Sequence, residues 1–218
     1  MSEVILGIDT STRVSVGVAR DGLPLASHLA GDSRSHAELL VPTIQSVLAA
    51  GHVGLADLTG VAVGMGPGPY TGLRVGIAAA EMIAEVAGVA VWRHCSLDVL
   101  GIGWARTVVE GDFVACTDAR RRELYWAVYD SSGRRIDGPF VSGPGELPAL
   151  PVVGPGSLLY PVPGVVAPGG AELVVDGGWL AAYAGRLEDV GAEPLYLRHA
   201  DAVPSAGPKP VLVGRESR

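Results

Sequence analysis

The chain has 218 residues, of which 48% are hydrophobic, and a formal net charge of −7. That length and apolar content suffice for the core of one large or two small domains, and they argue against intrinsic disorder. An acidic chain also lacks the clustered lysines and arginines with which a protein binds nucleic acid by itself. The one short basic cluster, Arg120–Arg122, is interpreted as a solvated face.

Cysteine usage and hydropathy indicate the cellular compartment in which the protein is expected. Cys95 and Cys116 each lie beside or inside an apolar run, and two cysteines do not make a disulfide framework. Buried free thiols are typical of a reducing compartment. The first residues lack the features of a signal peptide, and the most apolar segment, Val75–Val89, is too short to cross a bilayer. We therefore expect a cytoplasmic protein that does not enter a membrane.

The first fifty residues predict two consecutive hairpins and a helix. The apolar run Val4–Ile8 is typical of a buried strand, and the alternation over Val14–Val18 predicts a second. The dipeptide Asp21-Gly22 favours a tight turn into a third strand, Pro24–Ala30. A helix is then expected from about His36 to Ala50, closed by a glycine.

The glycine- and proline-rich segment Gly64–Arg74 follows another apolar run and opens into a helix over about Thr71–Ala87. A glycine-rich turn at a helix N-terminus usually aims backbone amides at an anion. This loop, however, has no P-loop lysine, and Pro69 stands where the dinucleotide fingerprint needs its third glycine. We expect the loop to hold a fixed shape rather than to bind phosphate.

The predicted helix after this loop carries few charges, Arg74, Glu81 and Glu85, and these fall close to one stripe. A helix that is apolar on most faces must be covered on most faces. Burial inside its own domain explains the pattern, and so does packing against another subunit. The pattern alone does not decide between them.

The second half of the chain repeats the order of the first. After a helix over Ser96–Ala105, strands are expected at Phe113–Cys116, Leu124–Tyr129 and Arg135–Val141, with an aspartate after the first of them. Two such units backed by helices make a two-lobed α/β protein.

The repeat sets the expected domain borders. We predict one lobe over residues 1–105, a second over 106–200, and a loosely held tail over 201–218. A last helix is expected over Gly178–Val190 in the second lobe.

Asp9 and Asp118 are the strongest carboxylate candidates, each at the end of the first strand of its unit. Facing each other across a cleft, they would suit a hydrated magnesium ion. Alternatively each caps a turn, which we favour because arginines follow Asp118 where a phosphotransferase has a small glycine-containing loop. The histidine spacings of helical metal motifs are missing, as is a Gly-x-Ser-x-Gly nucleophile elbow.

Several blocks of sequence, taken together in this order, resemble one family. They are Ile8–Thr12, Ser35–Pro42, Gly64–Arg74, Asp118–Tyr125 and Pro194–Arg198. The family is TsaB, the dimerization subunit of the bacterial machinery that makes threonylcarbamoyladenosine in tRNA. The glycine-proline loop is its most specific block, although this chain has Met65, Pro69 and Tyr70 where the family pattern has Arg, Ser and Phe.

The resemblance implies a two-lobed, duplicated RNase H-like/actin-like α/β fold, with mixed sheets flanked by helices. It implies a non-catalytic scaffold that binds the transferase TsaD, with the ATPase TsaE joining the complex. It also implies a homodimer when the subunit is alone, contact with tRNA only through the complex, and no metal or cofactor. Whether a nucleotide binds weakly or at the subunit joint is left open by the sequence. The alternative is an ATP-dependent phosphotransferase or ATPase of the same fold, using Asp9, Asp118 and the loop.

The resemblance also assigns residues to two surfaces. The remnant nucleotide cleft comprises Asp9, Thr10, Ser11, Thr12 and Asp118. The expected partner-binding residues lie on the two helices of the first lobe: His36, Leu39, Leu40, Thr43, Ile44, Val47, Leu73, Arg74, Ile77, Ala80, Glu81 and Ala84.

Overall fold

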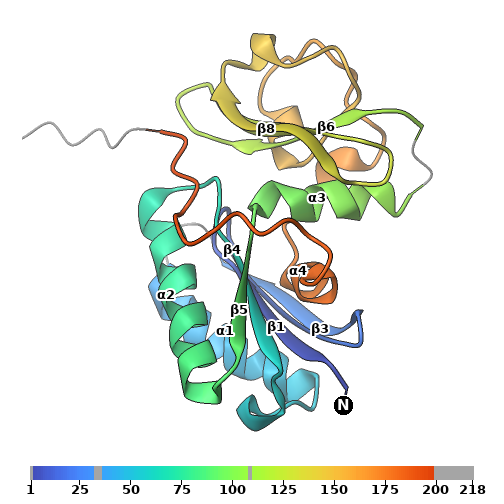
Figure 1. Cartoon of the computed structure of the whole chain (residues 1–218). Coiled ribbons are helices and arrows are strands. Elements are labelled where there is room, and N and C mark those ends of the chain that lie inside the picture. Colours follow the sequence, from blue (N-terminus) through green and yellow to red (C-terminus); the bar gives the residue numbers. More distant parts are fainter. Residues whose placement is uncertain (1, 32–35, 108–109, 199–218) are drawn as a thin grey trace, which may run out of the picture.

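The computed structural model describes residues 2–31, 36–107 and 110–198. Figure 1 shows two mixed β-sheets with helices packed against them and one helix, α3, lying between them. The predicted segment 201–218, and Ser35 before the first helix, lie outside the described residues.

The first sheet has the strand order β3-β2-β1-β4-β5. Its first three strands form the two predicted antiparallel hairpins, whereas β4 and β5 join in parallel because a helix precedes each of them. The strands are β1 (Val4–Asp9), β2 (Val14–Arg20), β3 (Leu23–Ala30), β4 (Gly60–Gly64) and β5 (Ala90–His94).

The second sheet repeats this arrangement with the order β8-β7-β6-β9. Two antiparallel pairs are again followed by a strand that joins the first one in parallel. The two-lobed, duplicated RNase H-like/actin-like α/β fold predicted from the sequence is thereby confirmed. The strands are β6 (Phe113–Asp118), β7 (Leu124–Tyr129), β8 (Arg135–Ser142) and β9 (Val152–Val153).

Helices α1 (His36–Ala50) and α2 (Tyr70–Ala87) cover one face of the first sheet. Their apolar stripes meet alternate residues of β1 and β2, such as Leu6 and Val16, in one hydrophobic cluster. α2 ends at Gly88, which takes the left-handed conformation that closes many helices.

The opposite face of the first sheet shares a core with the second sheet. α3 (Ser96–Ala105) and α4 (Gly177–Tyr183) pack there, so that Ile5 of β1, Phe113 of β6 and Leu180 of α4 belong to one cluster. The two sheets are therefore joined through buried side chains and not only through the chain.

α4 is shorter than predicted, because the helix expected to reach Val190 ends at Tyr183. Asp176 caps its first turn by accepting hydrogen bonds from two amides, and Gly185 follows its end. The chain after α4 runs back across the first sheet, where the amide of Val190 donates to the Arg93 carbonyl. The sequence pattern failed here because tertiary contacts, not helix propensity, set the end of the helix.

The predicted border between lobes separates the two sheets, but the last described part of the chain returns to the first sheet. Gly177 fits against Gly17 so closely that a Cβ on Gly17 would lie 2.0 Å from the Gly178 amide nitrogen. Short 3-10 turns complete the structure at Leu55–Asp57, Pro144–Glu146, Pro155–Leu158 and Gly170–Glu172. Within the described residues, none of the helices has the length and apolar character needed to cross a bilayer.

Candidate functional site

The first residues of the glycine-proline loop are hydrogen-bonded to the rest of the protein. The amide of Met65 donates to the His94 carbonyl, and that of Gly66 donates to the Ser96 hydroxyl. A Cβ on Gly68 would lie 2.7 Å from the Ser11 carbonyl oxygen, so only glycine allows this approach. Two amides that could face an anion are thus already used, as expected for a loop that holds a shape.

Asp9 lies at the end of β1 with no exposed surface. Its Oδ1 accepts hydrogen bonds from the Ser11 amide (2.8 Å) and hydroxyl (2.6 Å), and its Oδ2 accepts one from the Ser96 hydroxyl. Gly64 lies directly behind it, since a Cβ there would be 1.7 Å from Asp9 Oδ2. The carboxylate is therefore a buried turn cap whose oxygens are occupied by hydroxyl and amide donors.

Asp118 caps the corresponding turn between β6 and β7, where its Oδ1 accepts a hydrogen bond from the Arg120 amide at 2.7 Å. The next three residues all have positive φ: 64° at Arg120, 54° at Arg121 and 63° at Arg122. Such a conformation costs a residue other than glycine on the order of 1 kcal/mol or more. A turn that would suit glycine is built from three arginines.

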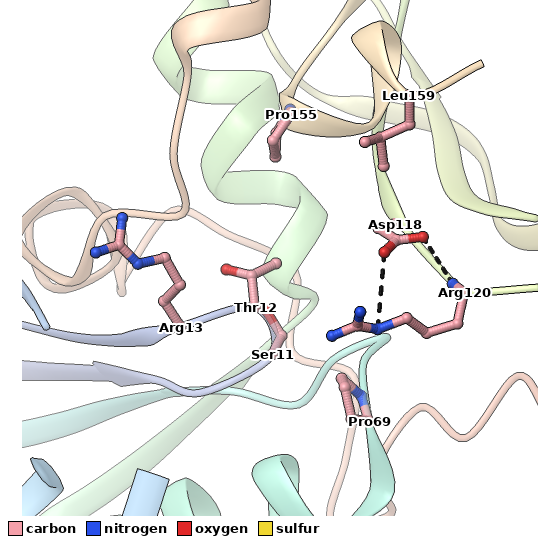
Figure 2. A pocket seen from close by; sticks show the side chains of 8 residues that line it. All are labelled: Ser11, Thr12, Arg13, Pro69, Asp118, Arg120, Pro155 and Leu159. Carbon is pink, nitrogen blue, oxygen red and sulfur yellow. Dashed lines mark hydrogen bonds and ion pairs between the residues drawn. The ribbon is translucent and has the colours of Figure 1, made fainter. Parts of the chain in front are cut away.

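A cavity of about 310 Å³ lies between the two sheets at this end of the molecule (Figure 2). Asp118 and Arg120 line it from the second sheet, forming an ion pair at 3.7 Å. Ser11, Thr12 and Arg13 line it from the turn after β1, while Asp9 and Thr10 are not among its lining residues. The remaining lining residues are Pro69, Pro155 and Leu159.

The two aspartates thus do not share one open cavity. Of the five predicted cleft residues, Ser11, Thr12 and Asp118 line it, whereas Thr10 donates its hydroxyl to the Gly72 carbonyl at 2.8 Å. Asp9 is enclosed behind them. These contacts do not suit a metal–nucleotide complex held between the two carboxylates, because one of them is buried and hydrogen-bonded within the protein.

The structure places most of the predicted partner-binding side chains in the chain's own core. Leu39 is half-buried and packs against the same cluster. Arg74 and Glu81 are exposed, and Glu81 pairs with Arg93 at 3.1 Å. Nothing is described of the His36 side chain. The buried members are Leu40, Thr43, Ile44, Val47, Leu73, Ile77, Ala80 and Ala84.

The solvent face of α2 carries residues that the sequence reasoning missed. Met82 is 61% exposed and Val86 is 76% exposed, with Ala78 and Glu85 beside them. The signal was available, because Ala78, Met82 and Val86 recur at four-residue spacing on the side opposite the Gly72, Gly76 and Ala80 stripe. We call Ala78, Met82 and Val86 the α2 ridge.

At the start of α2, Tyr70 and Arg74 contact Tyr196, near the end of the described residues. The Tyr70 and Tyr196 rings lie 4.8 Å apart, and the Arg74 guanidinium lies 4.1 Å above the Tyr70 ring. The Leu195 amide donates to the Met65 carbonyl at 2.9 Å. The Pro194–Arg198 block is thereby fastened across the glycine-proline loop.

An ionic cluster around the buried Asp98 links α3 to the second sheet. Asp98 of α3 accepts hydrogen bonds from the Tyr129 hydroxyl and from Arg135, each at 2.9 Å, and Arg135 also reaches Glu188. Burial raises the pKa of the Asp98 carboxyl, while Arg135 and Tyr129 lower it only in part. No sequence motif pointed to this cluster.

The two cysteines are packed in the core. Cys95 and Cys116 are buried and free, as predicted. Burial raises the pKa of the Cys95 thiol, and it raises that of Cys116 to about 12, so both are protonated at neutral pH. Among the described residues, no three side chains of His, Cys, Asp or Glu gather as a metal site.

Comparisons with known proteins agree on one family. A family model described as "TsaD: tRNA N6-adenosine threonylcarbamoyltransferase" matches residues 30–155. An uncharacterized protein of Mycobacterium tuberculosis is 40% identical over 93% of this chain and 95% of its own length. The tRNA threonylcarbamoyladenosine biosynthesis protein TsaB of Escherichia coli is 33% identical, over 57% of this chain and 54% of its own.

The structural comparison also covers most of the chain. A crystal structure from Pseudomonas aeruginosa, of an uncharacterized protein with similarity to peptidase YEAZ, superposes with a TM-score of 0.73 at 28% identity. The match covers 90% of this chain and 100% of that one. The family model matches more than half of the sequence, and relatives named TsaB are similar to the same chain. The chain therefore belongs to this threonylcarbamoyladenosine family as a TsaB-like member.

Proposed function

We propose that this chain is a non-catalytic subunit of the machinery that makes threonylcarbamoyladenosine in tRNA. It binds a TsaD-type transferase and supports threonylcarbamoyl transfer to the adenosine beside the anticodon. The names of its TsaB relatives support the pathway, although this chain matches only 54% of the length of the Escherichia coli and Bacillus subtilis proteins so named. The binding role rests on the structure.

The α2 ridge carries the proposal. Met82 and Val86 present two large apolar side chains on the solvent side of a helix, at i and i+4, with a glutamate before each of them, Glu81 and Glu85. An exposed apolar stripe rimmed by charges is typical of a protein interface, where burying each such side chain contributes about 1.5–3 kcal/mol. In this proposal the residues of α1 and α2 that were predicted to bind the partner but are buried stiffen the surface, and the ridge, Arg74 and Glu81 make the contact.

The cleft residues support a scaffold over an enzyme. Asp9 is engaged by Ser11 and Ser96, and the loop amides of Met65 and Gly66 are engaged within the protein. A phosphotransferase needs a carboxylate and loop amides that turn toward its substrate. The proposal also includes a homodimer when the subunit is alone and a complex that TsaE joins. The subunit contacts tRNA only within that complex.

The test is co-purification with the TsaD homologue of the same organism. Met82→Glu/Val86→Glu is expected to abolish association, because two charges would be buried at the interface. Leu158→Glu/Val165→Glu is the matched control, since these side chains are 72% and 76% exposed on the part of the chain that follows β9. Normal association of the α2 double variant would contradict the proposed interface.

The rival function predicts nucleotide binding by the isolated chain. Calorimetry with Mg-ATP is expected to show no micromolar binding. Micromolar binding that Asp9→Asn abolishes would overturn the scaffold proposal and favour the phosphotransferase. The circular dichroism spectrum of that variant is the control for folding, because Asp9 is buried.

A further inference from the structure

An open groove of about 480 Å³ lies beside β8, the outer strand of the second sheet. It is larger than the cavity of about 310 Å³ at the Asp118 turn. Strands β7 and β8 and the segment that follows β8 contribute its lining. The residues that line it, which we call the β8 groove, are Trp126, Val128, Ile136, Asp137, Glu146, Pro148 and Leu150.

The apolar side chains of the β8 groove are only partly covered by the residues that the structure describes. Ile136 is 44% exposed. Trp126 is half-buried, and its ring lies 4.8 Å from that of Phe140, which is itself 38% exposed. Exposed apolar and aromatic side chains that gather in a groove are typical of surfaces that bind an extended peptide segment. The β8 groove therefore suits an apolar stretch of chain.

Both charged residues that line the β8 groove are acids. Asp137 Oδ1 accepts a hydrogen bond from the Gly138 amide at 2.9 Å, and Glu146 Oε1 accepts one from the Gly143 amide at 3.2 Å. Both side chains are exposed, and within the described part of the chain no cationic residue lines the groove with them. The charge of the groove therefore favours an occupant that is positively charged.

The sequence that follows Arg198 has this chemistry. Residues 199–218 lie beyond the described part of the chain, and they include the apolar run Val211–Val213, with Lys209 before it and Arg215 after it. Over residues 209–218 the side chains carry three positive charges and one negative charge. An apolar run flanked by cations is complementary to an apolar groove that carries two carboxylates.

The described chain ends near enough to the β8 groove for this segment to reach it. Arg198 donates a hydrogen bond to Glu123, which directly precedes β7. The start of β7 lies opposite Ser142, the last residue of β8. Asp137 lies about 17 Å from Ser142 along the strand, at about 3.3 Å per residue. Residues 199–209 span up to about 36 Å when fully extended, which exceeds that distance.

We propose that residues 209–215 bind in the β8 groove of their own chain. The apolar run packs on Trp126 and Ile136, and the lysine pairs with Asp137 or Glu146. The bound segment covers the outer strand of the second sheet, whose edge would otherwise be open to pairing with another chain. This inference does not rest on the proposed function, because the α2 ridge belongs to a helix that covers the first sheet.

The full chain offers a direct test, because Lys209 is its single lysine. A carbodiimide joins an amine to a carboxylate only where the two are in contact, and mass spectrometry of the digested protein identifies the joined pair. Of the 23 aspartates and glutamates, Asp137 and Glu146 are expected to carry most of the Lys209 cross-links. Cross-links spread over the other acids, or the absence of any Lys209 cross-link, overturn the proposal.

A denaturing gel of the same reaction shows whose segment occupies the groove. A chain that is cross-linked to itself keeps the mass of one chain, whereas a cross-link to a second copy doubles the mass. The Lys209 cross-links to the groove are expected in the single-chain band. Their presence mainly in the double-mass band would show that the segment binds another copy, and the proposal would be wrong.

Serine substitutions in the segment test its apolar contact. Val211→Ser/Val213→Ser keeps Lys209 but removes two apolar side chains, so the yield of cross-links to the groove is expected to fall about fivefold or more. Ala202→Ser/Val203→Ser is the matched control from an earlier part of the same segment, and it is expected to leave the yield unchanged. Equal yields from the unmodified chain and from both variants contradict the proposed binding.

A substitution in the groove gives the reciprocal test. Ile136→Ser is expected to lower the yield about as much as the valine variant, because it removes the apolar surface on which the run packs. Leu23→Ser is its matched control, since Leu23 is 68% exposed on β3 of the other sheet. Both side chains are exposed, so both variants are expected to fold, and circular dichroism checks this. A loss that is equal in the two variants overturns the assignment of the groove.

Discussion

At the scale of single residues, burial decides what a carboxylate does in this protein. Asp9 accepts hydrogen bonds from hydroxyl and amide donors, whereas Asp98 faces Arg135 and the Tyr129 hydroxyl. Burial raises the pKa of Asp98 in spite of its cationic partner, because desolvation outweighs the attraction. The Asp98–Arg135 pair therefore links α3 to the second sheet without adding the stability that its geometry alone would suggest.

A pH titration of stability tests this view of Asp98. Between the ordinary value of 3.8 and the raised pKa, the folded state binds more protons than the unfolded state, so stability gains as pH falls through that window. Above the raised pKa the contribution is constant. The free energy of unfolding of the unmodified chain, minus that of Asp98→Asn, is therefore expected to rise on acidification. Urea unfolding at a series of pH values measures it, and a fall would mean that Arg135 dominates.

At the scale of elements, α2 shows how glycine sets the position of a helix. A Cβ on Gly76 would lie 2.2 Å from Thr10 Oγ1, the hydroxyl that donates to the Gly72 carbonyl. The helix can therefore approach the end of β1 only where it has no side chain. Gly88, by contrast, has open space around it and is required by its φ of 67°.

Alanine at these two positions separates close packing from backbone strain. Gly76→Ala gains about 1 kcal/mol of helix propensity but must displace Thr10, so a net loss of about 1–3 kcal/mol is expected. Gly88→Ala meets no atom within 4 Å and is expected to cost about 1 kcal/mol through its φ alone. Urea unfolding of both variants gives the comparison. A stabilised Gly76→Ala would show that the helix is free to shift.

The elements were also the level at which sequence reasoning was most accurate. An apolar run predicted β1, alternation predicted β2 and the Asp21-Gly22 turn signal predicted β3, while α1, α2 and α3 were expected close to their observed bounds. These signals are local in the sequence, so they do not depend on contacts between distant segments. The end of α4 was predicted wrongly, since the helix stops just before Gly185 and the chain beyond it pairs with Arg93 instead. The buried face of α2 was not predicted either, because both of its faces are apolar and only tertiary packing selects one.

At the scale of the whole molecule, α4 connects the two halves of the sequence. Leu180 packs with Ile5 of β1, and Gly177 donates its amide to the Ser15 hydroxyl at 2.8 Å. The face of the first sheet that carries Ile5 is thus completed by residues more than 150 positions later in the chain. Repetition of the strand order allowed two units to be predicted. It did not predict that α4, from the second half of the sequence, packs on the sheet of the first half.

A fragment ending at residue 105 tests whether the first sheet needs α4 in order to fold. It contains all strands of the first sheet but leaves Ile5, Ala19 and Ala62 without the cover of α4. We expect it to bind a hydrophobic dye and to lack a cooperative thermal transition, and co-expression with residues 106–198 to restore both properties. A fragment that unfolds cooperatively by itself would show that the first lobe is an independent domain.

Some parts of the candidate sites were predicted from the sequence and others were not, because only some of them depend on local signals. Asp9 and Asp118 were placed correctly at two turns, because an aspartate after a buried strand is a local signal. The joining of Arg13, Arg120 and Arg198, and the cluster around Asp98, depend on contacts between distant segments. No local pattern encodes such contacts.

The fastening of Pro194–Arg198 across the glycine-proline loop has a consequence for how the protein is made. A ribosome releases the loop and α2 more than a hundred residues before it releases Tyr196, whose ring stacks on Tyr70. During that interval the apolar face that α4 covers is exposed, so the first sheet completes its folding only after residues 177–196 have been synthesised. A chain truncated before Gly177 would therefore leave the apolar face of the first sheet uncovered instead of containing one finished lobe.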